Sequence, residues 1–152
     1  MKPARQQTGF ALIEAVIAIT IVSIAAVTIM AQISQANVQS GRSLVQTEAA
    51  FVADAYLDEI LARPFDDPNG IDGEAARRFY DDVDDYNGLT DVGARDGNGN
   101  LMPGGNRYTI RVTVANSNVL LGVPAADALL VNVTVTDPVG ARMIVSGVRL
   151  RP

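Results

Sequence analysis

One apolar run dominates the first third of the chain. Residues 10–31 read FALIEAVIAITIVSIAAVTIMA, and Glu14 is the only charged residue among them. A helix rises 1.5 Å per residue, so a helix over this run is about 33 Å long, enough to cross a hydrocarbon core of about 30 Å. The run therefore predicts a transmembrane helix over residues 10–31.

The helical pattern continues past the apolar run. Residues 32–62 contain no proline and become more polar, while apolar residues recur at helical spacing at Val45, Val52, Tyr56 and Ile60, in a stripe that Leu44, Phe51 and Leu57 widen. Pro64 disfavours helical geometry at Arg63 and cannot donate to the helix ladder. We expect an amphipathic, soluble helical half over residues 32–62, continuous with the first half in a rod of about 80 Å.

The second half of the chain changes its period. Residues 63–106 are rich in Asp, Asn and Gly, which are typical of turns, and we expect an acidic loop region there. Apolar and polar residues then alternate in two runs within residues 107–152. In a third run, 141–150, the apolar residues shift from one set of alternate positions to the other near Ser146 and Gly147, which predicts a β-bulge. The pattern predicts an α+β fold, with the long helix packed on a C-terminal antiparallel sheet.

Composition narrows the chemistry. The chain has no cysteine and no histidine, and its single lysine is Lys2. This excludes disulfides, imidazole ligands and histidine-activated nucleophiles. No Asp-Thr-Gly-like element is present either, so we expect no enzymatic activity. The net charge of −5 repels phosphate, and we expect no nucleic-acid partner.

Two charge features bear on the apolar run. Residues 1–9 carry Lys2 and Arg5 and no acid, so the positive-inside bias predicts a cytoplasmic N-terminus and a periplasmic C-terminal part. Glu14 stands inside the run, where a charge costs about 2–3 kcal/mol at depth and less near the interface. A plain membrane anchor or a secretory signal peptide gives no reason for this carboxylate, although it could also snorkel to the interface.

The segment from Gly9 to Glu14, with the basic residues before it and the apolar run after it, resembles the prepilin signature of type IV pilin-like proteins. The resemblance implies that prepilin peptidase cuts residues 1–9 away after Gly9, at the inner membrane, and N-methylates Phe10. It also implies that Glu14 meets the N-terminal amine of a neighbouring subunit during assembly. The implied partners are the peptidase, the inner-membrane assembly platform, and major and minor pilins. Ala11 departs from the signature, because Thr or Ser is commoner there.

Two later segments resemble a narrower group. YLDEILARPFDDPNG at 56–70 and RRFYDDVDDYNG at 77–88 are similar to the D-type minor pilins of mannose-sensitive haemagglutinin (MSHA) pilus systems. This resemblance implies a minor pilin that helps to initiate or prime a type IV pilus. A type II secretion pseudopilin and a plain membrane-anchored periplasmic binding module stay open as alternatives.

The acidic segment offers docking and metal candidates. We expect a cluster to lie exposed, where it can meet arginines or a divalent cation; its members are Asp81, Asp82, Asp84 and Asp85. Asp96, Asn98 and Asn100 resemble the start of a calcium loop. That match fails further on, because Leu101 stands where Gly is needed and Arg107 where a bidentate Glu is needed. We expect no cofactor, with calcium as the alternative.

Overall fold

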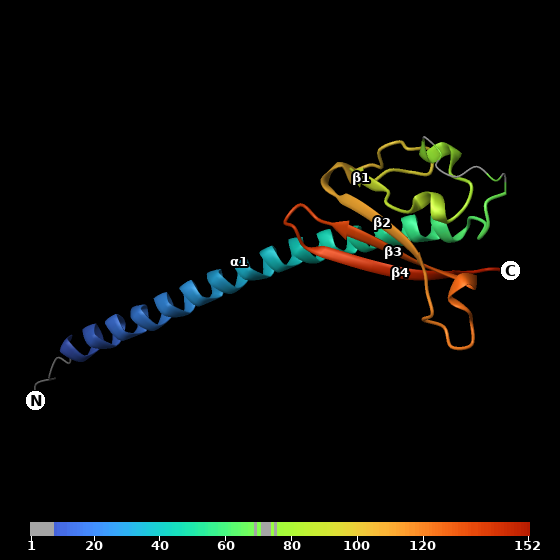
Figure 1. Ribbon diagram of the computed structural model, residues 1–152. Helices are drawn as coiled ribbons and strands as arrows, with labels where there is room; N and C mark the ends of the chain where they lie inside the picture. Colours follow the sequence, from blue (N-terminus) through green and yellow to red (C-terminus); the bar gives the residue numbers. More distant parts are fainter. Residues whose placement is uncertain (1–7, 69, 71–73, 75) are drawn as a thin grey trace, which may run out of the picture. The chain divides into compact units, whose positions relative to one another are not determined.

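The computed structural model describes residues 8–68, 70, 74 and 76–152 (Figure 1). Most of the predicted leader, residues 1–7, lies outside this part. One helix, α1 (Thr8–Leu61), precedes four strands: β1 (Thr90–Val92), β2 (Thr109–Asn116), β3 (Ala128–Thr136) and β4 (Arg142–Leu150). Four single-turn 3-10 helices lie between them: η1 (Arg77–Phe79), η2 (Asp84–Tyr86), η3 (Gly105–Arg107) and η4 (Ala125–Asp127). The predicted α+β class is confirmed. Two compact units divide within α1, between Ser43 and Leu44.

The first unit is helical and apolar. The hydroxyl side chains within residues 10–31 bond back to carbonyl groups about one turn earlier: Thr20 to Val16, Ser23 to Ile19 and Thr28 to Ile24. A hydroxyl that is satisfied within its own helix needs no water partner. The apolar run is therefore compatible with lipid at its hydroxyl positions as well.

The second unit, Leu44–Pro152, builds its core between the last turns of α1 and one face of the sheet. The helix contributes a buried stripe of Ala49, Val52, Ala53, Tyr56, Leu57 and Ile60, with Val45 partly buried beside it. Such a stripe, at three- and four-residue spacing, covers one face of a helix. The expectation that Leu44 and Phe51 widen it is wrong, since they are 61% and 68% exposed.

The sheet is antiparallel throughout, in the order β1-β2-β3-β4. Its core face carries buried Ile110, Val112 and Val114 from β2 and the alternate valines of β3, so the predicted alternation over these strands is confirmed. Strand β1 was not predicted. It is three residues long and pairs with Thr109 to Arg111 at one edge of the sheet, and so short a strand carries no periodic signal.

The predicted bulge in β4 is absent. Its pairing with β3 runs without interruption from Thr136 opposite Arg142 to Ala128 opposite Leu150. The alternation of apolar and polar residues in the sequence is interrupted because Gly147 faces α1 at very close range. A Cβ there would lie 2.7 Å from Cδ1 of Leu61 and 3.1 Å from Cδ1 of Leu57. The helix thus occupies the space of a side chain, and the inward position carries glycine where the pattern calls for an apolar residue.

Candidate functional site

The predicted processing junction lies in the first turn of α1. The helix begins at Thr8, so the backbone of Gly9 and Phe10 is helical, while the side chain of Phe10 lies outside the described part. Glu14 follows Phe10 by four residues, which places both on one face of the helix about one turn apart. Its side chain is exposed.

The helix beyond this junction has an uncovered apolar surface. Every residue from Ala11 to Leu44 is exposed in the described chain, and large apolar side chains such as Val22, Val27 and Met30 are 66–75% exposed. The helix has the length and the apolarity of a membrane span, with a mean hydropathy of 2.5 in its most apolar window. A contiguous apolar surface of this size marks contact with lipid or with other protein chains.

The prokaryotic N-terminal methylation motif matches residues 4–30. The match includes the Gly9–Phe10 junction, Glu14 and most of the apolar run. The chain matches no curated protein and no solved structure. Together, the motif and the exposed apolar helix support a membrane-anchored pilin or pseudopilin that is processed by prepilin peptidase.

A buried ion-pair network lies in the second unit, where α1, η1 and β1 meet. The guanidinium of Arg77 holds Glu59 with two bonds, from Nε to Oε1 at 3.2 Å and from Nη2 to Oε2 at 2.8 Å. Its Nη1 donates to Oδ2 of Asp91 at 2.7 Å. The same guanidinium lies 4.3 Å from the ring centre of Tyr56, in cation–π geometry. One arginine thus joins the helix to the edge strand.

Two tyrosines complete this network. The hydroxyl of Tyr56 donates to Asp91 at 2.7 Å and accepts the backbone N–H of Arg95 at 2.7 Å. The hydroxyl of Tyr86 donates to Oε1 of Glu59 at 2.8 Å. Burial raises the pKa of both tyrosines to about 12. The groups of the network engage one another, so its role is to hold the unit together.

Sequence reasoning missed this network. Asp91 occupies an inward position of β1, opposite Ile110, where an apolar residue is the usual expectation. The one usable signal for a buried ion pair was Glu59, a carboxylate that directly precedes Ile60, and Ile60 belongs to the apolar stripe. Nothing in the local pattern links it to Arg77, which lies 18 residues further along the chain.

The predicted acidic cluster is only partly exposed. Asp82 is 2% exposed and Asp81 and Asp85 are half-buried, so the expectation of a wholly exposed cluster is wrong. Oδ1 of Asp82 accepts the N–H of Asp85 at 3.0 Å, and Oδ2 of Asp85 accepts the N–H of Asp81 at 2.9 Å. Carboxylates that cap backbone amides in this way turn toward the chain. Burial raises the pKa of Asp82 to about 7.

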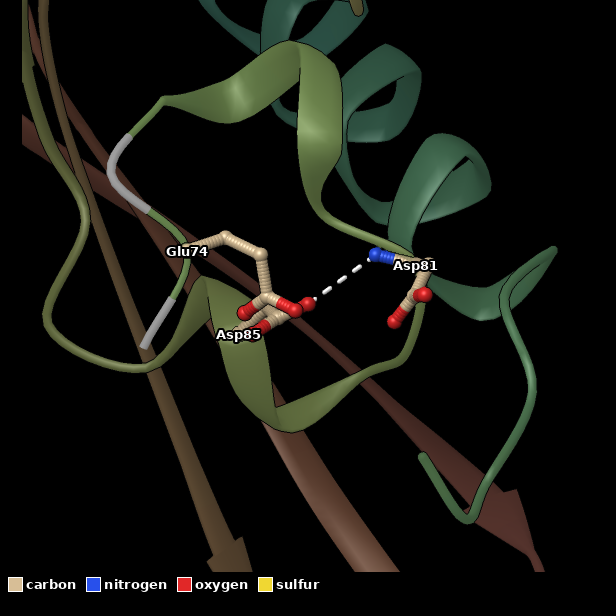
Figure 2. Close-up of side chains that lie close together, drawn as sticks. All are labelled: Glu74, Asp81 and Asp85. Carbon is tan, nitrogen blue, oxygen red and sulfur yellow. Dashed lines mark hydrogen bonds between the residues drawn. The ribbon is translucent and has the colours of Figure 1, made fainter. Parts of the chain in front are cut away.

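The structure also divides this cluster between two places. Asp82 and Asp84 line a cavity of about 530 Å³, together with Phe65 and Arg151. Asp81 and Asp85 lie close to Glu74, and one carboxylate oxygen from each of the three residues lies within 4.8 Å of the other two (Figure 2). The shared hydrogen bond with the Asp85 carboxyl raises the pKa of Glu74. The docking role of the four aspartates stays a prediction.

The calcium-like loop is held by its own hydrogen bonds. Oδ1 of Asp96 accepts the N–H groups of Asn98 at 3.0 Å and of Asn100 at 2.8 Å, and the Asn100 side chain donates to Oδ2 at 3.2 Å. The bonds from Asn100 lower the pKa of Asp96. They close a turn between Arg95 and Leu101, which form a β-bridge. This accounts for the Asp and Asn residues without an ion.

Proposed function

We propose that the chain is a minor pilin-like subunit of an MSHA-type type IV pilus, cut after Gly9 by prepilin peptidase and methylated at Phe10. One observation carries the proposal: a methylation motif at residues 4–30 leads directly into a helix that is exposed from Ala11 to Leu44. A soluble protein would cover such a surface with its own chain. A subunit that passes from a membrane into a bundle of neighbouring helices keeps it free for each stage.

In the membrane stage, the apolar run lies in the inner membrane with its N-terminus in the cytoplasm and the Leu44–Pro152 unit in the periplasm. Lys2 and Arg5 support this orientation through the positive-inside bias. Residues 10–31 hold eleven Ile, Val, Leu and Phe residues, each worth about 0.3–0.6 kcal/mol at the helix centre, or roughly 3–7 kcal/mol together. This gain exceeds the cost of Glu14, which lies near the end of the run.

In the filament stage, Glu14 pairs with the N-terminal amine that cleavage creates on Phe10 of a neighbouring subunit. An unpaired carboxylate or an unpaired amine is unfavourable in an apolar bundle, and pairing the two lowers the cost of burying both charges. Because desolvation cancels much of the attraction, the pair contributes specificity of register more than strength. The assembly platform and the other pilins are the partners at this stage, and the role of the subunit is structural.

The assignment to a minor pilin of MSHA type rests on the two segments 56–70 and 77–88. The buried network supports reading them together, because the first segment supplies Tyr56 and Glu59 and the second supplies Arg77 and Tyr86. The two segments therefore contact each other in the folded unit, and a change in one affects the contacts of the other. The methylation motif itself is common to pilins and to type II secretion pseudopilins, so it does not choose between the two filaments.

The test is mass spectrometry of the mature N-terminus after co-expression with a prepilin peptidase. We expect a chain that begins at N-methyl-Phe10, and we expect Gly9→Val to keep residues 1–9 while still entering the membrane. Thr8→Val is the control, since it changes the residue next to Gly9 but leaves the Gly9–Phe10 junction itself unchanged. A filament built from chains that retain residues 1–9 would refute processing. Recovery of the chain in pili sheared from cells supports its assembly into a type IV pilus, whereas retention of the chain in the cell envelope contradicts that assembly.

A further inference from the structure

We propose that the outer face of the sheet docks on the solvent face of α1 in a second copy of this chain. One face of the sheet packs on the helix, and the other lies outside the core. This outer face carries two exposed arginines, Arg111 on β2 and Arg142 on β4. Strands β2, β3 and β4 contain no Asp or Glu, and Asp91 of β1 is buried on the core face. No acid of the sheet therefore balances the two arginines.

The two arginines surround an apolar residue. Arg142 precedes Ile144 by two positions on the same face of β4, and Arg111 lies two strands away, since both residues pair with Thr134 of β3 or lie beside it. From the strand rise and the strand spacing, the two arginine backbones are about 7 Å and about 10 Å from that of Ile144. Ile144 is 63% exposed. Neither arginine has an ion-pair partner among the described residues.

The solvent face of α1 in the same unit has the opposite charge. Phe51, Asp54 and Asp58 are exposed at three- and four-residue spacing, so they form one stripe on the helix. No Lys or Arg lies between Ser43 and Ala62. Within the described chain, neither aspartate has an ion-pair partner. Phe51 is 68% exposed, so this stripe also presents an apolar residue beside two like charges.

One copy cannot bring these two faces together. The buried stripe of α1 covers the core face of the sheet, so the unit has two layers whose outer sides point away from each other. A second copy supplies the complementary face. Contacts of sheet on sheet or of helix on helix oppose like charges, whereas helix on sheet pairs the carboxylates with the guanidinium groups. This contact is heterologous, so its repetition extends an open row of copies.

The experiment is zero-length cross-linking of the full-length chain in detergent micelles. A carbodiimide joins a carboxylate to a primary amine in contact with it, and Lys2 is the one lysine of the chain, so Arg142→Lys adds a single amine to the sheet. Mixing isotope-labelled and unlabelled chains lets mass spectrometry separate links between copies from links within one copy. We expect position 142 of one copy to be linked to Asp54 or Asp58 of another. The yield should fall from about 50 mM to about 500 mM salt.

Arg78→Lys is the matched control, because Arg78 is exposed on η1 and belongs to neither face. We expect its amine to form no link between copies to Asp54 or Asp58. Links from position 142 only to acids outside the stripe would overturn the assignment of the helix face. Absence of any link between copies from position 142 would overturn the contact.

Charge reversal tests the contact without cross-linking. A sheet variant carries Arg111→Glu and Arg142→Glu, and a helix variant carries Asp54→Arg and Asp58→Arg. Two exposed ion pairs together contribute a factor of about 2–30 to affinity, so each variant alone should associate more weakly than the wild type by that factor or more. An equal mixture should recover association, because each reversed face then meets a face of opposite charge. Sedimentation in density-matched micelles measures both.

Thermal unfolding followed by tyrosine fluorescence checks that each variant is folded. If a double variant is unfolded, the single changes Arg142→Glu and Asp58→Arg replace it. A mixture that associates no better than its components overturns the proposal, and so does equal association of the wild type and the separate variants. Association that requires a different pilin-like subunit overturns the choice of a second copy. The proposal does not rest on the pilin assignment, because cleavage after Gly9 and association are measured separately.

Discussion

Replacing Arg77 by methionine should be among the most damaging single changes in the Leu44–Pro152 unit. The arginine donates to two carboxylates, and their side chains are 19% exposed for Glu59 and 11% exposed for Asp91. Methionine fills a similar volume but leaves both charges without their cation. Breaking a buried ion pair by removing one partner costs about 3–5 kcal/mol, because the remaining charge stays desolvated.

This cost translates into a large shift in melting temperature. The unit has about 110 residues, and for a domain of that size 1 kcal/mol corresponds to about 4 °C. We therefore expect Arg77→Met to lower Tm by about 12–20 °C. Changing Glu59 to Gln and Asp91 to Asn in the same chain removes the stranded charges, and we expect that triple variant to recover a large part of the loss.

Tyrosine fluorescence isolates this transition from the long helix. The chain has no tryptophan, and its four tyrosines, Tyr56, Tyr80, Tyr86 and Tyr108, all lie in the Leu44–Pro152 unit. Thermal melts of the full chain in micelles thus report that unit alone. Arg78→Met is the matched control, because Arg78 is exposed and stacks on Phe79 at 4.7 Å, and we expect a change of less than about 1 kcal/mol. A shift below 4 °C for Arg77→Met, or a triple variant less stable than the single one, would refute the reasoning.

Three further predictions concern other parts of the chain. Gly147→Val should cost about 1–3 kcal/mol by overpacking against Leu61, measured as a lower Tm, whereas Ser146→Val, on the opposite face of β4, should leave Tm nearly unchanged. Glu14→Leu should favour membrane insertion by up to about 2–3 kcal/mol yet reduce recovery in sheared filaments, because the partner of the neighbouring amine is lost; normal incorporation would favour the snorkelling interpretation. Asp96→Ala should lower Tm only slightly, because the N–H groups of Asn98 and Asn100 that lose the carboxylate are exposed and can bond water instead; a large drop in Tm would contradict this.

Sequence periodicity determined the elements that depend on near neighbours. The apolar run with Glu14 predicted the exposed helix, and the alternation around Val112 and Val133 predicted the two central strands. These signals are reliable because helix and strand each place side chains at a fixed period, so a buried face is written into consecutive residues. The methylation motif is local in the same sense, since a peptidase reads residues around one bond.

Only the tertiary structure decided which polar groups meet. Arg77 reaches Glu59 and Asp91 across 18 and 14 residues of chain, and no period connects these positions. The meeting of Glu74 with Asp85 likewise depends on the path of the loop, which polar sequence leaves open. Gly147 was misread as a bulge because a missing side chain looks the same whether the strand slips or a helix presses on it. Contacts of this kind are set by the packing of whole elements, and a single sequence carries no local record of them.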